Sequence, residues 1–292
     1  MRLVMEYVVT SIAGSGYALP QDFAESMSAA PAMQGVRVAS HQWLKPGVAV
    51  DVFVTGLAPD VLDGRVQDAL RGKPVDAIVQ PAPKRKRKLL ISDMDSTMIT
   101  CECIDELADF AGKKAEVAAL TERAMRGDLL FEDTLAQRVA LLAGLPESVL
   151  QQCFDERVKP MPGAKELLAA HKAAGGISIL VSGGFTFFTS RVRSMLGFDE
   201  DHSNQLEVKD GKLTGKVISP ILGKEAKLAI LQASCRKLGI TTDDALAVGD
   251  GANDLPMLLA AGMGVAYHAK PVVRAQAKAR IDHADLSALL YV

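Results

Sequence analysis

The sequence lacks a strong net charge and any long apolar run. Over its 292 residues the formal net charge is only -2 at pH 7, which gives no reason to expect a nucleic-acid partner. No uninterrupted apolar stretch approaches the roughly 20 residues that span a bilayer. The first residues also lack the charged-then-apolar layout of a signal peptide. These absences predict a cytoplasmic protein with no membrane partner, and the length suggests about two domains.

Cysteine is scarce as well, with only Cys101, Cys103, Cys153 and Cys235 in the chain. The pair Cys101-x-Cys103 does not have a zinc-binding spacing, and no second pair or histidine cluster completes it. We therefore expect four reduced thiols. Apolar residues make up 49% of the chain, which is enough for a sizeable core.

Residues 81–88, Pro-Ala-Pro-Lys-Arg-Lys-Arg-Lys, are typical of a linker. Two prolines stiffen this segment, and five consecutive cations favour contact with water. A basic run can also bind nucleic acid or carry a localisation signal. Because an apolar strand follows directly, we interpret the run as a solvated boundary between residues 1–80 and 89–292.

Before the linker, short elements alternate in the order β-α-β-β-α-β, which is the ferredoxin-like arrangement of a small α+β domain. The pattern predicts strands over 6–12, 36–43, 48–55 and 75–79, and helices over 21–30 and 60–70. By topology alone this part resembles the ACT-type regulatory domains of enzymes of amino-acid metabolism. The alternative is a small domain that packs, or mediates dimers, and binds nothing.

After the linker, apolar strands alternate with helical stretches, which predicts a parallel α/β sheet. Residues 103 to about 160 interrupt this order with a wholly helical pattern, in which Ile104, Leu107, Ala108 and Ala111 share one face. An insertion at this point would lie above the carboxyl end of the first strand. We expect it to form a cap over the residues that follow that strand.

Three apolar strands of this part each end in a polar motif. Leu89-Leu90-Ile91 precedes Asp93-Met94-Asp95-Ser96-Thr97, Ile177 to Val181 precedes Ser182-Gly183-Gly184, and Ala245 to Val248 precedes Gly249-Asp250-Gly251-Ala252-Asn253-Asp254. In a parallel sheet all three ends lie at the same edge, where open α/β sheets bind ligands. Their convergence is more specific than any one motif.

The paired acids suggest metal-assisted phosphoryl transfer, because one carboxylate can be the nucleophile while the other moves protons. Asp93 and Asp250 can offer the oxygen ligands that Mg²⁺ prefers. Ser182 and the amides beside Gly183 can donate hydrogen bonds to phosphoryl oxygens. A lysine is also needed to offset the phosphoryl charge. The stretch 223–227 offers two candidates, Lys224 and Lys227.

Together these motifs resemble those of the haloacid dehalogenase superfamily, from about residue 89 to the C-terminus. Residues 93–97 match its first motif, 182–184 its second, Lys227 its third and 249–254 its fourth. The resemblance implies a Rossmann-like parallel sheet core with an inserted helical cap. Within the superfamily the sequence is similar to the phosphoserine phosphatase family, in the stretches 93–106, 124–127, 131–139, 181–185 and 208–215.

The resemblance also implies roles for the site residues. Asp93 would be the nucleophile, and Asp95 the general acid and then the general base. Mg²⁺ would be held by the Asp93 carboxylate, the Asp95 backbone carbonyl and the Asp250 carboxylate. The residues implied to hold or position the phosphoryl group are Ser182, Gly183, Lys227 and Asn253, with Asp254 behind them.

The resemblance implies O-phospho-L-serine as the substrate, hydrolysed in the last step of serine biosynthesis. This molecule carries an ammonium and a carboxylate besides its phosphate. Glu102 can take the ammonium, and Arg138 can take the carboxylate with its bidentate fork. Without the resemblance, both side chains would be interpreted as solvated surface charges. Met125 and Phe131 are candidates for the pocket lining. The alternative activity is that of a related phosphatase for another small phosphomonoester. A further hypothesis is that the N-terminal domain senses an amino acid and regulates the catalytic part. The oligomeric state is open, a homodimer included.

Overall fold

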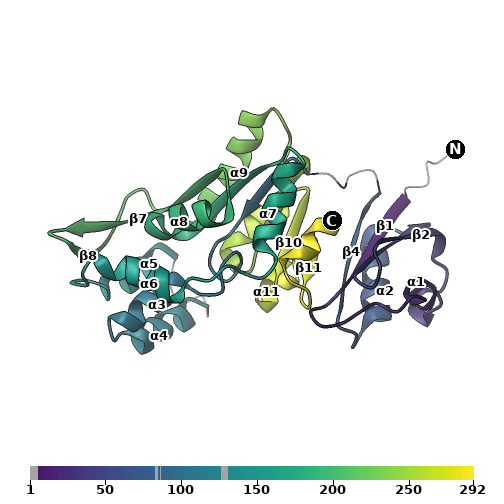
Figure 1. Cartoon of the computed structure of the whole chain (residues 1–292), viewed down its shortest axis with the longest axis horizontal. Helices are drawn as coiled ribbons and strands as arrows, with labels where there is room; N and C mark the ends of the chain where they lie inside the picture. Colours follow the sequence, from purple (N-terminus) through teal and green to yellow (C-terminus); the bar gives the residue numbers. More distant parts are fainter. Residues whose placement is uncertain (1–5, 83–84, 86, 126–130) are drawn as a thin grey trace.

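The computed structural model describes residues 6–82, 85, 87–125 and 131–292, without the side chains of residues 122–125 and 131. These residues form a four-stranded and a seven-stranded sheet. Figure 1 shows an elongated molecule, with the smaller sheet at one end, next to the C-terminal strand β11 (Ala279–Ile281). A group of helices lies at the opposite end. Among the described residues, no helix has both the length and the apolar character needed to cross a membrane.

The smaller sheet is antiparallel, with the strand order β2-β3-β1-β4. Its elements are β1 (Glu6–Ala13), α1 (Phe23–Ser28), the 3₁₀ helix η1 (Pro31–Met33), β2 (Arg37–Lys45), β3 (Ala49–Thr55), α2 (Pro59–Leu70) and β4 (Val75–Pro81). The expected order of strands and helices is confirmed. The first helix ends earlier than expected, because Ala30 precedes a proline and adopts an extended conformation.

Strands β1, β3 and β4 of the smaller sheet bury both faces, whereas β2 at its edge is largely exposed. Val9 and Val52 pack with Leu62 of α2 in a core between the sheet and its helices. Ile12 and Ile78 point to the other face and join the hydrophobic core of the larger part of the chain. The two parts are therefore packed against each other through apolar side chains as well as joined by a linker.

A polar junction adds to this contact. Asp76 of β4 is 4% exposed, and its carboxylate accepts backbone N–H groups of residues 282, 283 and 284 at 2.8, 3.1 and 2.8 Å. These three residues directly follow β11. The carboxylate thus fixes the smaller sheet to the C-terminal strand of the larger one.

The basic run over 81–88 contributes to the same junction. The Arg85 guanidinium contacts the Asp51 carboxylate, the Thr10 hydroxyl at 3.0 Å and the Tyr291 carbonyl at 2.7 Å. Asp51 is only 1% exposed, and a carboxylate so buried requires a cationic partner. The expectation that the whole run is solvated is therefore wrong at Arg85.

The larger sheet has the strand order β11-β10-β9-β5-β6-β7-β8 and is parallel except for the β7–β8 hairpin. This confirms the expected α/β architecture. Its other strands are β5 (Leu89–Ser92), β6 (Ile177–Phe185), β7 (Glu200–Lys209), β8 (Lys212–Ile218), β9 (Ala245–Gly249) and β10 (Met263–Tyr267). The flanking helices are α7 (Ala164–Ala173), α8 (Thr186–Leu196), α9 (Lys224–Leu238), α10 (Leu255–Ala260) and α11 (Pro271–Arg274), with 3₁₀ helices η2 (Thr242–Asp244), η3 (Ala252–Asp254) and η4 (Leu286–Tyr291).

Within the described residues, four helices lie between β5 and α7: α3 (Cys103–Phe110), α4 (Lys114–Met125), α5 (Phe131–Ala140) and α6 (Ser148–Arg157). The face expected to be apolar in α3 is buried at Ile104, Leu107 and Ala108, while Ala111, just past the end of the helix, is half-buried. Leu135 and Val139 of α5 are buried as well. Figure 1 shows these helices at the end of the molecule away from the smaller sheet, beside β8.

Candidate active site

The three polar motifs meet at one edge of the larger sheet. Ser92, the last residue of β5, lies opposite Leu180 of β6 and Val248 of β9 in the parallel register. Asp93 follows Ser92 directly, and Ser182 and Asp250 each come two residues after their paired position. The backbone N–H of Asp93 also donates to the Val248 carbonyl at 3.0 Å.

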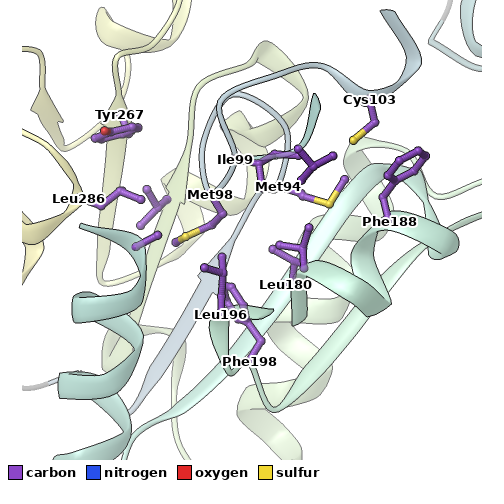
Figure 2. Close-up of a cluster of buried hydrophobic side chains, with 14 of the residues drawn as sticks. Met94, Met98, Ile99, Cys103, Leu180, Phe188, Leu196, Phe198, Tyr267 and Leu286 are labelled. Atoms are coloured by element: carbon purple, nitrogen blue, oxygen red, sulfur yellow. The ribbon is translucent and has the colours of Figure 1, made fainter. Parts of the chain in front are cut away.

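The residue between the two acids anchors their loop. Met94 is fully buried, and Figure 2 shows it in one apolar cluster with Met98, Ile99, Leu180 and Phe188. The N–H groups of Met98 and Ile99 both donate to the Met94 carbonyl, at 2.8 and 3.1 Å, and close a tight turn. Because the Met94 side chain is packed in the core, the loop is anchored, and Asp93 and Asp95 on either side of it remain at the sheet edge.

Asp93 forms a buried ion pair with the lysine of α9. The Lys227 ammonium lies 2.9 Å from Asp93 Oδ1 and 2.7 Å from Asp254 Oδ1, and its side chain is 1% exposed. Burial and the Asp254 charge raise the pKa of Asp93 well above its usual value. Burial opposes the charge on Lys227, but the carboxylates of Asp254 and Asp93 outweigh it, so the pKa of Lys227 is raised. Lys224 instead is 56% exposed and contacts Glu225.

Asp93, Asp250 and Asp254 form a buried acidic cluster in which one carboxylate oxygen from each residue lies within 4.8 Å of the other two. Burial and the Asp254 charge raise the pKa of Asp250 to about 6. Lys227 and Lys270, whose ammonium lies 4.0 Å from Asp250 Oδ2, supply two positive charges for three carboxylates. A set of oxygen donors with excess negative charge suits a divalent cation. The residues present therefore fit a divalent metal site.

Asp95 occupies a different environment. Its carboxylate accepts the Cys103 N–H at 3.1 Å and the Ser182 hydroxyl at 3.4 Å. Burial and the negative charge of Glu102 raise the pKa of Asp95 to about 7. A carboxyl group with this pKa can both donate and accept a proton near neutral pH.

Gly184 is required for this arrangement. A Cβ atom at this position would lie 2.9 Å from Asp95 Oδ2 and 3.0 Å from Ser182 Oγ, closer than carbon and oxygen atoms normally approach. The Gly184 N–H also donates to Ser182 Oγ at 2.8 Å, which orients the hydroxyl. The second motif therefore packs its backbone directly against the second acid.

The two residues expected to bind the substrate's amino-acid groups are each held by a neighbour that the sequence did not indicate. Glu102 accepts a hydrogen bond of 2.7 Å from the Ser96 hydroxyl. Arg138 donates to Asp105 at 2.8 Å and is 16% exposed. Ser96 belongs to the first motif, but neither its contact with Glu102 nor the contact of Asp105 with Arg138 could be predicted from spacing, because folding brings these partners together.

For three further expected residues, the described part of the chain shows no hydrogen bond or ion pair with the other site residues. Asn253 is half-buried on η3, next to the acidic cluster in sequence. The side chains of Met125 and Phe131 lie outside the described part of the chain, so the expectation that they line the pocket stays a prediction.

Comparison with known proteins identifies the family of the chain. The model of the haloacid dehalogenase-like hydrolase family matches residues 90–259. A phosphoserine phosphatase of Polaromonas sp. (strain JS666 / ATCC BAA-500) is 50% identical over 208 residues, covering 70% of this chain and 88% of that protein. The chain belongs to the haloacid dehalogenase-like hydrolase family.

Two solved structures extend the comparison. A family hydrolase from Salmonella enterica serovar Typhi matches 98% of both chains with a TM-score of 0.86 and 29% identity. A structure described as a phospho-aspartyl intermediate analogue of phosphoserine phosphatase covers 70% of this chain and 98% of its own, with a TM-score of 0.66 and 41% identity. The first of these similarities includes the N-terminal part of the chain.

Proposed function

We propose that this chain is a Mg²⁺-dependent phosphoserine phosphatase, which hydrolyses O-phospho-L-serine to L-serine and phosphate. The observation that carries the proposal is the pairing of Asp93 with buried Lys227, beside Asp95 with its pKa raised to about 7. The relatives named phosphoserine phosphatase, at up to 50% identity among those compared, support the same assignment.

In the first step, an oxygen of the Asp93 carboxylate attacks phosphorus. The new bond gives an aspartyl-phosphate, and the bond from phosphorus to the serine oxygen breaks. Lys227, 2.9 Å from Asp93, offsets negative charge on the phosphoryl group. Ser182 and the backbone around Gly183 supply hydrogen bonds to the same group.

Asp95 moves the protons. In its neutral form it gives a proton to the serine oxygen as that oxygen leaves. The resulting carboxylate then takes a proton from water as the water oxygen attacks phosphorus. The bond between phosphorus and the Asp93 oxygen breaks, which releases phosphate and restores the Asp93 carboxylate. The pKa near 7 makes both forms of Asp95 accessible at neutral pH.

Asp93, Asp250 and the backbone carbonyl of Asp95 would hold the Mg²⁺ ion. The bound cation supplies positive charge that reduces repulsion between the carboxylate and the phosphate dianion. Asp254 contributes indirectly, because its oxygens are engaged by Lys227 at 2.7 Å and by the Gly251 N–H at 3.0 Å.

Selectivity for serine would come from two charged side chains, one directly before the helical insertion and one within it. Glu102 pairs with the ammonium, and Arg138 pairs with the carboxylate. Arg138 Nε is buried and has no hydrogen-bond partner among the described residues, which leaves a donor for a ligand. Asn253 completes the cradle of the phosphoryl group.

We assign residues 1–80 to an ACT-like ferredoxin-fold domain, 81–88 to the connection and 89–292 to the phosphatase domain, with a helical cap over about 103–160. Cytoplasmic location and homodimer formation belong to the same proposal. Calorimetry tests whether the first domain senses an amino acid. Serine and other amino acids are titrated into the full-length Asp93→Asn variant. Heat that survives blockade of the active site with phosphoserine supports a second site.

A substrate panel tests the activity. We expect kcat/KM for L-phosphoserine to exceed the values for sugar and nucleoside phosphates, and Asp93→Asn to abolish turnover of all of them. Equal rates across the panel would favour the alternative, a related phosphatase for another small phosphomonoester. An active Asp93→Asn protein would exclude the aspartyl-phosphate route.

A further inference from the structure

Asn204 of β7 lies outside every motif, yet it connects two parts of the phosphate-binding site. Its side chain is 1% exposed and makes three hydrogen bonds. Nδ2 donates to the Gly183 carbonyl at 2.8 Å and to the Leu222 carbonyl at 3.3 Å, while Oδ1 accepts the Leu222 N–H at 2.6 Å. One amide therefore joins the second motif to the segment that leads into α9.

The first partner lies in a bulge of β6. In the β6–β7 pairing, Val181 lies opposite His202 and Phe185 opposite Asn204. Residues 182–184 therefore face a single residue of β7, so the strand ladder cannot satisfy their backbone groups. The Asn204 side chain takes over one of these bonds at Gly183.

The second partner fixes the start of α9. Leu222 precedes Gly223, which is the N-cap residue of this helix, and the Lys227 N–H donates to the Gly223 carbonyl at 3.3 Å. Because both backbone groups of Leu222 are bonded to Asn204, the helix begins at a defined position relative to Gly183. Lys227 lies one turn further along the helix.

We propose that Asn204 is a positioning residue that sets the distance between the Ser182–Gly183 loop and Lys227. This inference rests on the proposed function, in which both elements hold the phosphoryl group. Asn204 touches no reacting atom, and its effect passes through Gly183 and Leu222. It should therefore control affinity for the phosphoryl group and leave recognition of the serine part unchanged.

Two substitutions separate the contributions. Asn204→Ala removes all three bonds. Asn204→Asp keeps the volume and the acceptor for the Leu222 N–H, but places a carboxylate oxygen against the carbonyls of Gly183 and Leu222. Gln205→Ala, at the exposed neighbouring position of β7, is the matched control.

Each full-chain variant is titrated with inorganic phosphate and, separately, with L-serine in the presence of Mg²⁺. We expect both Asn204 variants to bind phosphate about 10- to 100-fold more weakly and to lose kcat to a similar extent, since buried groups lose their partners. L-serine affinity should stay within about twofold, whereas general damage to the fold would weaken both ligands. The control should match the unmodified protein.

Folded Asn204 variants that bind phosphate and turn over as the unmodified protein does would overturn the inference. If neither variant folds, amide hydrogen exchange of the unmodified protein decides: phosphate should slow exchange at Gly184 and Leu222 together, and protection of Gly184 alone would contradict the coupling. The phosphate measurements do not depend on the substrate. If the chain neither hydrolyses phosphoserine nor binds L-serine, the proposed function is refuted. The phosphate affinities of the Asn204 variants would still test the role of Asn204.

Discussion

The ammonium of Lys227 lies 2.9 Å from the carboxylate of Asp93, with both side chains buried at the carboxyl edge of the larger sheet. This contact joins a residue directly after β5 to a residue of α9, more than a hundred positions later in the chain. The Lys227 ammonium gives the candidate nucleophile a positively charged partner, and it offsets part of the negative charge of the acidic cluster.

Replacing Lys227 by Met should remove both stability and activity. Loss of one partner of a buried ion pair destabilises a protein by about 3–5 kcal/mol, because the remaining charge is uncompensated. Urea unfolding at pH 8 and phosphatase assays measure the two effects. Lys224→Met, three residues away on the same helix and exposed, is the control and should change neither. Equal behaviour of the two variants would contradict the assigned role of Lys227.

Metal affinity should fall as the pH decreases through about 6. Burial and the Asp254 charge raise the pKa of Asp250 to about 6 in the metal-free chain, so below this pH a proton competes with the cation for the carboxylate. Binding of Mg²⁺ at pH 6 should therefore release protons. Calorimetry in two buffers with different ionisation enthalpies counts them. An affinity that stays constant from pH 5.5 to about 8 would be inconsistent with this view.

Gly184→Ala should lower activity strongly with little change in folding. The added Cβ would lie 2.9 Å from Asp95 Oδ2 and would displace the acid from its position. We expect kcat to fall by about 100-fold or more, in line with small displacements of catalytic groups. Gly64→Ala, in the middle of α2 with open space around its Cβ, should leave activity unchanged and add about 0.5–1 kcal/mol of stability.

Glu102→Gln should change both substrate preference and pH dependence. The Glu102 charge helps to raise the pKa of Asp95, so its removal should lower that pKa and move the alkaline limb of the kcat/KM profile to lower pH. For phosphoserine, kcat/KM should fall by about 10- to 100-fold as the ammonium loses its charged partner. Hydrolysis of p-nitrophenyl phosphate, which has no ammonium, should fall much less. Parallel losses on both substrates would argue against the ammonium contact.

Asp76→Ala should weaken the junction between the two sheets. Its carboxylate accepts N–H groups of residues 282–284, and we expect a loss of about 2–4 kcal/mol, because hydrogen bonds to charged groups are among the stronger ones. Thermal unfolding should broaden or split into two transitions. Asp68→Ala, on the surface of α2, should change stability by no more than about 1 kcal/mol. An unchanged single transition for Asp76→Ala would show that the apolar contacts suffice.

Much of the architecture follows from local patterns in the sequence. The apolar runs at 89–91, 177–181 and 245–248 predicted three strands, and all three are present as neighbours in the sheet. Strand formation responds to short-range periodicity, and parallel strands bring their carboxyl ends to one edge. The meeting of Asp93, Ser182 and Asp250 was therefore predictable from their positions after these strands.

The sequence alone determined the order of strands and helices before the linker, the convergence of the three motifs and the spacing of the two acids. The tertiary structure decided which of two neighbouring lysines is buried: Lys227 points to Asp93 because of the way α9 docks, whereas Lys224 stays in solvent. The tertiary structure also decided that Arg85 of the basic run donates to the Tyr291 carbonyl, and that Asn204 donates to the Gly183 carbonyl. The physical reason is common to all three. Burial and hydrogen bonding depend on segments remote in the chain, and no local pattern records which of them will meet.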